Sequence, residues 1–171
     1  MELVLLTGVS GFIAKHVALK LLNAGYTVRG TLRRMDRSDE VRAALAPYLT
    51  EHAGELTFVQ ADLESDAGWA DALQGITALV HTASPFPGAQ PKDAATVIRP
   101  AVEGTERALH AARAEGVGRV IMTSSTMAVL GAPLPPRPPN FCVGCPERPV
   151  FSALKLAQAE VGPVPVAADI G

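Results

Sequence analysis

The stretch Leu3-Val4-Leu5-Leu6-Thr7-Gly8-Val9-Ser10-Gly11-Phe12-Ile13-Ala14 decides the fold. Its first five residues form a continuous apolar run, which predicts a strand buried on both faces. Ile13, Val17 and Leu21 then share one helical stripe, and Gly25 is placed to end that helix. A strand, a glycine turn and a helix therefore follow one another at the start of the chain.

The same alternation continues to residue 131 and predicts an α/β fold with a doubly wound parallel sheet. Further strands are expected at 26–32, 55–60, 76–81 and 117–124. Helices are expected at 39–49, in a short segment that Ser65 would N-cap and Gly75 would end, and at 93–115. Pro100 should kink or split the last of these helices.

The glycine turn carries the first functional signal. Gly8 permits a tight turn, and Gly11 lets the backbone approach a pyrophosphate without a Cβ in the way. Ala14 takes a small position at which the helix packs closely on the strand. Free N–H groups at the helix start favour an anion. The pattern indicates a Rossmann-type dinucleotide-binding unit, with the alternative that the glycines serve geometry only.

Several motifs agree in order and spacing with a known family. Thr7–Ala14 resembles the TGxxGFIG fingerprint of the extended short-chain dehydrogenase/reductases, the NAD-dependent epimerase/dehydratase family. Asp62-Leu63 is similar to the family's adenine-contacting aspartate and its neighbour. The segments 80–85, 100–105 and 120–125 resemble the dihydroflavonol reductase and cinnamoyl-CoA reductase branch. The resemblance covers residues 1 to about 131.

The resemblance implies a set of cofactor-binding residues: Gly8, Ser10, Gly11, Phe12, Ile13, Arg33, Asp62, Leu63, His81, Thr82, Ala83 and Ser84. NAD-preferring members usually end the second strand with an acidic residue. Here that strand ends at Arg33-Arg34, with no carboxylate before Asp36. A guanidinium suits a 2′-phosphate. We therefore expect NADP and leave NAD open, the alternative being that both arginines are solvated strand-end charges.

Only part of the family's catalytic apparatus is present. The resemblance implies that Ser125 or Thr126 polarises a carbonyl, and that Lys155 acts beside a tyrosine that donates a proton. The chain has only two tyrosines, both far upstream, and Phe151 stands four residues before Lys155. Phenylalanine has no ionisable hydroxyl. The segment around Lys155 is equally well explained as one face of a short amphipathic helix.

The sequence changes character after Gly131. Nine of the fourteen prolines follow it. We expect a nucleotide-binding domain at 1–131 and, at 132–171, an irregular tail with one short helix near 151–161. The resemblance implies that the substrate domain of complete relatives is missing. Cys142 and Cys145 have C-x-x-C spacing, but no second pair accompanies them, so no metal site is predicted.

Composition limits the partners. The net charge is −2 and the pI is about 6.1, which gives no basic footprint for nucleic acid. No apolar run predicts a membrane span, and the N-terminus lacks signal-peptide features, so a cytoplasmic location is expected. A homodimer stays open. The resemblance implies an NADP-dependent reductase of aldehydes or ketones, impaired by the missing tyrosine. The alternative is a non-catalytic dinucleotide-binding module or a truncated gene product.

Overall fold

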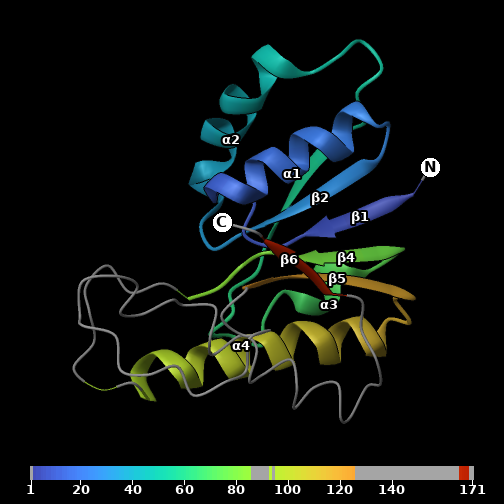
Figure 1. Cartoon of the computed structure of the whole chain (residues 1–171). Helices are drawn as coiled ribbons and strands as arrows, with labels where there is room; N and C mark the ends of the chain where they lie inside the picture. The colour runs from blue at the N-terminus through green and yellow to red at the C-terminus, as the bar shows by residue number, and fades with distance from the viewer. Residues whose placement is uncertain (1, 86–92, 94, 126–165, 170–171) are drawn as a thin grey trace.

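A six-stranded parallel sheet forms the centre of the molecule (Figure 1). The computed structural model describes residues 2–85, 93, 95–125 and 166–169. The strand order in the described chain is β3-β2-β1-β4-β5-β6, which confirms the doubly wound fold. The strands are β1 (Leu3–Leu6), β2 (Thr27–Leu32), β3 (Leu56–Gln60), β4 (Ala78–His81), β5 (Arg119–Ser125) and β6 (Val166–Asp169).

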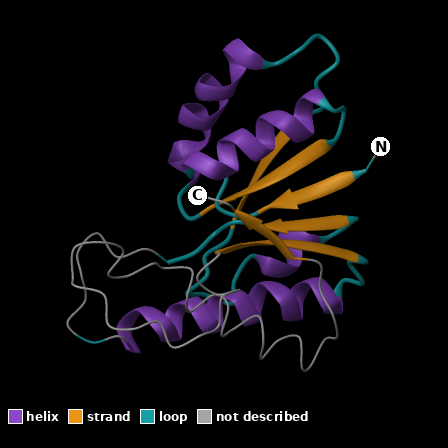
Figure 2. Cartoon of the chain, in the orientation of Figure 1, coloured by secondary structure: helices purple, strands orange, loops and turns teal. Residues whose placement is uncertain are grey.

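Helices cover both faces of the sheet, as Figure 2 shows. The helices α1 and α2 lie on one face, and α3 and α4 lie on the other (Figure 1). Their bounds are α1 (Phe12–Asn23), α2 (Ser38–Leu45), α3 (Trp69–Leu73) and α4 (Ala95–Ala114), with short 3-10 turns at Met35–Arg37 and Ala46–Tyr48. The strand order reverses between β1 and β4, and a crevice for a ligand forms at such a point beyond the carboxyl ends of the strands.

Each face of the sheet has its own apolar core. Val4 and Leu6 of β1 pack into the cluster beneath α1 and α2, whereas Leu5 packs into the cluster beneath α3 and α4. All three side chains are at most 3% exposed. The continuous apolar run at the start of the sequence is therefore a strand buried on both faces, as predicted.

Two predicted helix boundaries differ from the structure. Ser65 does not cap α3, because its hydroxyl accepts the N–H of Ala67 and the N-cap is Gly68, with a φ of 85°. The predicted helix 39–49 is α-helical only to Leu45, after which Pro47 lies in a 3-10 turn. Pro forbids the usual hydrogen bond to the fourth residue before it, which favours ending the regular helix there.

Two other expectations also differ. The helix α4 runs without a break through Pro100, which lies in its second turn and so gives up a single helical hydrogen bond. The tail at 132–171 was expected to be irregular apart from one short helix, yet β6 pairs in parallel with β5, from Met122 opposite Val166 to Ser125 opposite Asp169. The edge of β5 offers free backbone N–H and C=O groups to a further strand. Pairing of this kind cannot be predicted from a local sequence pattern.

Candidate functional site

The glycine turn joins β1 to α1. Gly8 has a φ of 66°, a left-handed conformation that favours glycine. The N–H of Gly11 donates to the carbonyl of Gly8 at 2.8 Å, which closes the turn. The first turn of α1 contains no acidic residue, and no side chain caps it. The helix start therefore offers free N–H groups and a positive dipole end to an anion.

The end of β2 fixes this turn in place. The N–H of Gly8 donates to the Thr31 hydroxyl at 2.9 Å, and the N–H of Val9 donates to the Thr31 carbonyl at 3.2 Å. Gly30 leaves the room for this contact, because a Cβ there would lie 2.6 Å from Cγ1 of Val9. Thr31, 23 residues downstream of Gly8, and its neighbour Gly30 thus support the turn. Neither was predicted as a site residue, since no local motif marks them.

Thr7 ties the turn to the segment that follows β4. Its hydroxyl oxygen accepts the N–H groups of Thr82 and Ala83, each at 3.0 Å. The hydroxyl's single proton then points to Nδ1 of His81, also at 3.0 Å, so His81 carries its own proton on Nε2. Burial lowers the pKa of His81 to about 4, which keeps the ring neutral. The Thr82 hydroxyl also donates to the Thr7 carbonyl at 2.6 Å.

Three arginines follow the end of β2. Among the described residues no carboxylate pairs with Arg33, whereas Arg34 lies 3.4 Å from Asp36 at an exposed position. Arg37 pairs with Glu40 at 2.8 Å and donates to the Ser10 hydroxyl of the glycine turn at 3.3 Å. The side chains of Arg33, Arg34 and Arg37 all line one cavity.

Glu40 pairs with two cationic side chains beside the arginines that follow β2. Its carboxylate accepts hydrogen bonds from Lys15 of α1 and from Arg37. The hydrogen bond from Lys15, followed by that from Arg37, lowers the pKa of Glu40. The carboxylate therefore stays ionised and holds α2 against the start of α1.

The opposite wall of the cavity is the turn after β3. Oδ1 of Asp62 accepts the N–H of Glu64 at 3.1 Å, which orders the turn. The indole N–H of Trp69 is shared between the carbonyls of Asp62 and Ser65, each at 3.0 Å. Leu63 lines the cavity beside Asp62. Asp62 and Leu63 therefore line the same cavity as Gly8 and Gly11 of the glycine turn.

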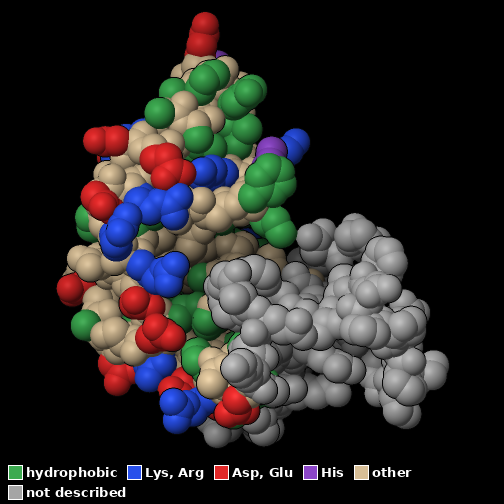
Figure 3. Space-filling model, turned by 90° about the vertical axis from the view of Figure 1, so that its left-hand side faces the viewer, with side chains coloured by type: hydrophobic (Ala, Val, Ile, Leu, Met, Phe, Trp, Pro, Cys, Tyr) green, Lys and Arg blue, Asp and Glu red, His purple; other side chains and the backbone are tan. Residues whose placement is uncertain are grey.

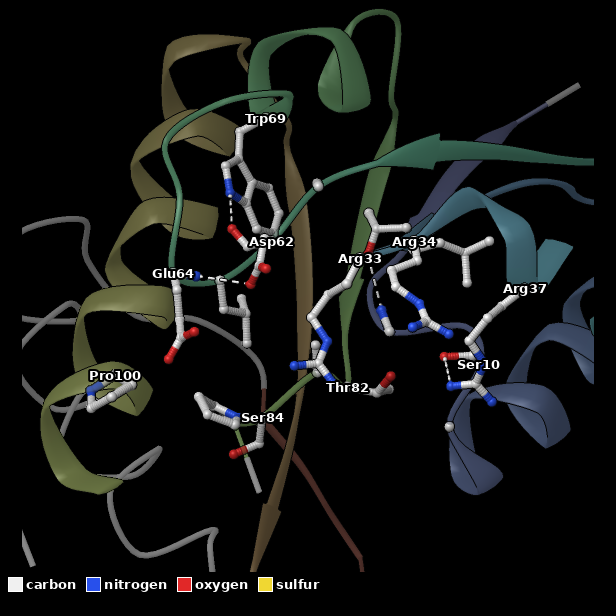
Figure 4. A pocket seen from close by; sticks show the side chains of 18 of the residues that line it. Ser10, Arg33, Arg34, Arg37, Asp62, Glu64, Trp69, Thr82, Ser84 and Pro100 are labelled. Atoms are coloured by element: carbon white, nitrogen blue, oxygen red, sulfur yellow. Dashed lines mark hydrogen bonds between the residues drawn. The ribbon is translucent and has the colours of Figure 1, made fainter. Parts of the chain in front are cut away.

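The cavity has a volume of about 980 Å³, and it runs from the glycine turn to the start of α4. Figure 4 shows Arg33 between Asp62 on one side and Ser10, Arg34 and Arg37 on the other. Figure 3 views the face where the strands end, and there Lys and Arg side chains gather beside Asp and Glu side chains. The predicted residues that line the cavity are Gly8, Ser10, Gly11, Arg33, Asp62, Leu63, Thr82, Ala83 and Ser84.

Other predicted residues lie elsewhere. The His81 side chain is 1% exposed and sits behind the cavity wall, so it supports the site and does not line it. Phe12 and Ile13 are not among the lining residues and stand exposed at the start of α1. Ser125 is the last residue of β5, at the carboxyl end of the sheet. Thr126 and Lys155 lie outside the described residues, as do Phe151 and the two cysteines.

Several lining residues were not predicted as site residues. Arg34, Arg37 and Thr31 come from the end of β2 and the turn after it, and Trp69 comes from α3. Thr96, Val97 and Pro100 add a wall from the start of α4. Arg37 carried a usable signal, since it is the third arginine within five residues at a strand end. Trp69 carried none, because it is 3% exposed and reads as a core residue.

The geometry fits a dinucleotide with an additional phosphate. The turn between Gly8 and Gly11 offers a cradle without side chains, and a Cβ on Gly11 would meet the Gly8 carbonyl at 3.2 Å. The arginines offer cationic donors for a phosphate, and Asp62 offers an acceptor at the other end. Within the described residues there is no cluster of three or more His, Cys, Asp or Glu side chains that could hold a metal ion.

Comparison with known proteins agrees with this geometry. The model of the NAD-dependent epimerase/dehydratase family matches residues 4–160. The chain belongs to this family. The match continues past residue 131, where the resemblance had been expected to end. The boundary there reflected the many prolines, which hide a family pattern from an inspection based on regular periodicity.

Named reductases are among the relatives in this epimerase/dehydratase family. Dihydroflavonol 4-reductase of Zea mays is 36% identical over 128 residues, which cover 74% of this chain and 35% of that protein. Cinnamoyl-CoA reductase 1 of Petunia hybrida is 37% identical over 131 residues, covering 75% and 36%. The crystal structure of Gre2 from Candida albicans in complex with NADPH aligns with a TM-score of 0.65 and 29% identity, covering 75% and 38%.

The chain spans little more than a third of the length of these relatives. Among the helices that the structure describes, none has the length and apolar character needed to cross a membrane.

Proposed function

We propose that the cavity binds NADP and that the chain supplies the nucleotide-binding part of a reductase of aldehydes or ketones. The observation that carries the proposal is the continuity of the cavity from the glycine turn to Arg33 and Arg37. A crystal structure of a relative in complex with NADPH supports it. The relatives of this chain include reductases named for dihydroflavonol and cinnamoyl-CoA, which supports a small carbonyl compound as the substrate.

The charge distribution favours NADP over NAD. A 2′-phosphate carries two negative charges at most, and Arg33 offers a guanidinium that no described carboxylate neutralises. Arg37 is already oriented toward the glycine turn by its bonds to Ser10 and Glu40. An acidic residue that would bond both ribose hydroxyls of NAD is absent from the end of β2. These residues would hold the ribose phosphate, and Gly8 and Gly11 would leave room for the pyrophosphate.

The chain's own residues support binding better than catalysis. When bound, the nicotinamide supplies a hydride. Ser125, at the carboxyl end of β5, is the residue proposed to donate a hydrogen bond to a carbonyl. The proton donor has no candidate among the tyrosines: Tyr26 precedes β2, Tyr48 lies in the 3-10 turn after α2, and neither lines the cavity. We therefore propose that carbonyl reduction by this chain is strongly impaired.

A non-catalytic dinucleotide-binding module is the second candidate, and the missing tyrosine is the observation that favours it. An assay of NADPH oxidation with aromatic and aliphatic aldehydes separates the two. General acid catalysis contributes about a hundred- to ten-thousandfold, so we expect turnover by the wild-type chain to fall below detection. The comparison uses wild type, Phe151→Tyr, and Phe151→Tyr combined with Lys155→Ala.

Each outcome of this assay assigns a function. A gain in Phe151→Tyr that disappears with Lys155→Ala identifies a reductase that has lost its acid. Three inert proteins that still bind NADPH identify the non-catalytic module. Strong turnover by the wild-type chain contradicts the claim that the tyrosine is both required and missing.

A further inference from the structure

The turn formed by residues 61–66 lines the cofactor cavity, but it is held from outside the cavity. Asp62 and Leu63 face the cavity from this turn. Within the turn, the N–H of Glu64 donates to the Asp62 carboxylate, and from α3 the indole N–H of Trp69 donates to the carbonyls of Asp62 and Ser65. A short turn with three carboxylates within five residues repels itself, so it needs a partner on a rigid element.

Arg107 of α4 is that partner. Its Nη1 donates to the Leu63 carbonyl at 2.7 Å, and its Nε bonds the Asp66 carboxylate. Nη2 lies 3.8 Å from Glu103, one helical turn away on α4. The Arg107 side chain is 25% exposed, and its planar guanidinium reaches the Leu63 carbonyl and the Asp66 carboxylate at once.

Gly104 makes the second contact between α4 and the turn. It is buried, and a Cβ there would lie 2.7 Å from Cβ of Leu63 and 3.1 Å from the Leu63 carbonyl oxygen. These atoms belong to the backbone and the root of a side chain, so they cannot rotate away. The turn therefore packs directly on the surface of α4, next to the hydrogen bonds that Arg107 donates to it.

We propose that Arg107 is a positioning residue that sets the place of Asp62 and Leu63 in the cofactor cavity without itself touching the cofactor. Arg107 does not line that cavity, so its effect on binding is indirect, and the turn is the cavity wall to which it is hydrogen-bonded. The proposal rests on the proposed function, since it concerns the adenine end of the same site. It adds a coupling between α4 and that end, because Thr96, Val97 and Pro100 of α4 line the same cavity.

Trp69 gives a direct readout of the turn. It is the only tryptophan in the chain, it is 3% exposed, and its N–H bonds the turn's carbonyls. Its emission and its quenching by acrylamide therefore report on the turn in the absence of any ligand. Binding of 2′,5′-ADP, which carries the adenine and the 2′-phosphate but no nicotinamide, reports on the same end of the cavity.

The experiment compares wild type, Arg107→Ala, Arg107→Lys and Gly104→Ala, with Arg99→Ala as the matched control. Arg99 lies on the same helix, pairs with the same Glu103 at 3.8 Å, and is 80% exposed. We expect Arg107→Ala to weaken 2′,5′-ADP binding by about tenfold, which corresponds to one charge-assisted hydrogen bond, and to make Trp69 more accessible to acrylamide. Arg107→Lys keeps the charge but has a single nitrogen, so its affinity and quenching should lie between those of wild type and Arg107→Ala. Arg99→Ala should match wild type in both.

The failure of this inference can be distinguished from a failure of the proposed function. If wild type does not bind 2′,5′-ADP, the proposed function falls, and the acrylamide quenching of Trp69 still decides whether Arg107 holds the turn. Unchanged quenching in Arg107→Ala overturns the inference, with or without a loss of affinity. If Arg107→Ala does not fold, 2′,5′-ADP binding and Trp69 quenching are measured on Arg107→Lys and Gly104→Ala instead. Wild-type values in both of these variants overturn the inference.

Discussion

At the scale of single residues, Gly11 shows what the absence of a side chain achieves. Its φ of −71° and ψ of 159° are open to every residue. Glycine therefore matters here because it has no side chain to fill the space in front of the turn. Gly8 differs, because its φ of 66° requires glycine and a Cβ would lie 3.0 Å from that of Ala83. Gly8 shapes the turn, whereas Gly11 keeps the phosphate side of it open.

A valine at position 11 should therefore abolish cofactor binding and leave a folded domain. Its Cβ needs a shift of only a few tenths of an ångström from the Gly8 carbonyl, but its methyl groups enter the phosphate cradle. Thermal melting with NADPH is the measurement. A ligand at a hundred times its Kd stabilises a protein by about 2.7 kcal/mol, and Gly11→Val should lose the resulting shift in Tm.

Gly118→Val is the control for this substitution. Gly118 has open space around it and lies before β5, at the other end of the sheet from the cavity. It should keep the wild-type shift in Tm. A Gly11→Val protein that keeps the shift as well would mean that the phosphates bind elsewhere.

His81 makes stability depend on pH. Its pKa is about 4 in the folded chain and 6.5 in its ordinary state, so between these values the unfolded chain binds the proton more strongly. The free energy of unfolding should fall as the pH drops from 6.5 toward 4, by on the order of 3 kcal/mol, and the loss should level off below 4. Protonation of Nδ1 would also remove the acceptor for the Thr7 hydroxyl.

Urea unfolding at several pH values between 7.5 and 4 measures this loss of unfolding free energy. His81→Asn keeps an acceptor for Thr7 and does not titrate, so its curve should fall less steeply than that of wild type over this range. His52→Asn, at an exposed position, is the control. Parallel curves for wild type and His81→Asn would refute the assignment of this pH dependence to His81.

At the scale of elements, the end of β2 decides the position of the glycine turn. Replacing Thr31 with valine keeps the shape of the side chain but leaves the N–H of Gly8 without its acceptor. We expect the free energy of unfolding to fall by about 1 kcal/mol, the net contribution of a hydrogen bond, because the Gly8 N–H is only part-buried. Denaturant unfolding measures it, with Thr57→Val of the neighbouring strand as control, since that hydroxyl reaches its partner only at 3.5 Å. Equal losses in both variants would contradict a special role for Thr31.

The elements also show what the sequence could predict. The strand β1, the glycine turn and α1 follow from local periodicity and turn chemistry, and they appear as expected. Ser65 looked like a helix cap because its residue type fits one, but the hydroxyl found a nearer N–H at Ala67. The strand β6 depends on the free edge of β5, a partner distant in sequence. Long-range pairing of this kind leaves no local signal.

The candidate site divides in the same way. The glycines, Arg33 and Asp62 could be found because each belongs to a motif with a fixed place at a strand end. Arg37 joins them through its bond to Ser10, and this contact depends on how α2 packs on α1. His81 was predicted as a cofactor contact, but its ring is buried and hydrogen-bonded to the Thr7 hydroxyl, so it does not line the cavity.

At the scale of the whole molecule, the sheet order brings distant segments to one cavity. The glycine turn follows β1, the arginines follow β2, the 61–66 turn follows β3, and the segment 82–85 follows β4. Because all these strands are parallel, their carboxyl ends share one edge of the sheet (Figure 1). On the proposed function, this edge of the sheet binds NADP through its arginines.

Calorimetric titration of NADPH and NADH tests that claim most directly. The proteins are wild type, Arg33→Ala, Arg37→Ala and, as control, Arg119→Ala, whose exposed side chain begins β5 at the opposite end of the sheet. Charge-assisted hydrogen bonds to a phosphate predict that wild type binds NADPH more tightly by about tenfold or more. Arg33→Ala and Arg37→Ala should reduce that preference, and Arg119→Ala should preserve it. Equal affinities for the two cofactors, unchanged in either arginine variant, would contradict the claim.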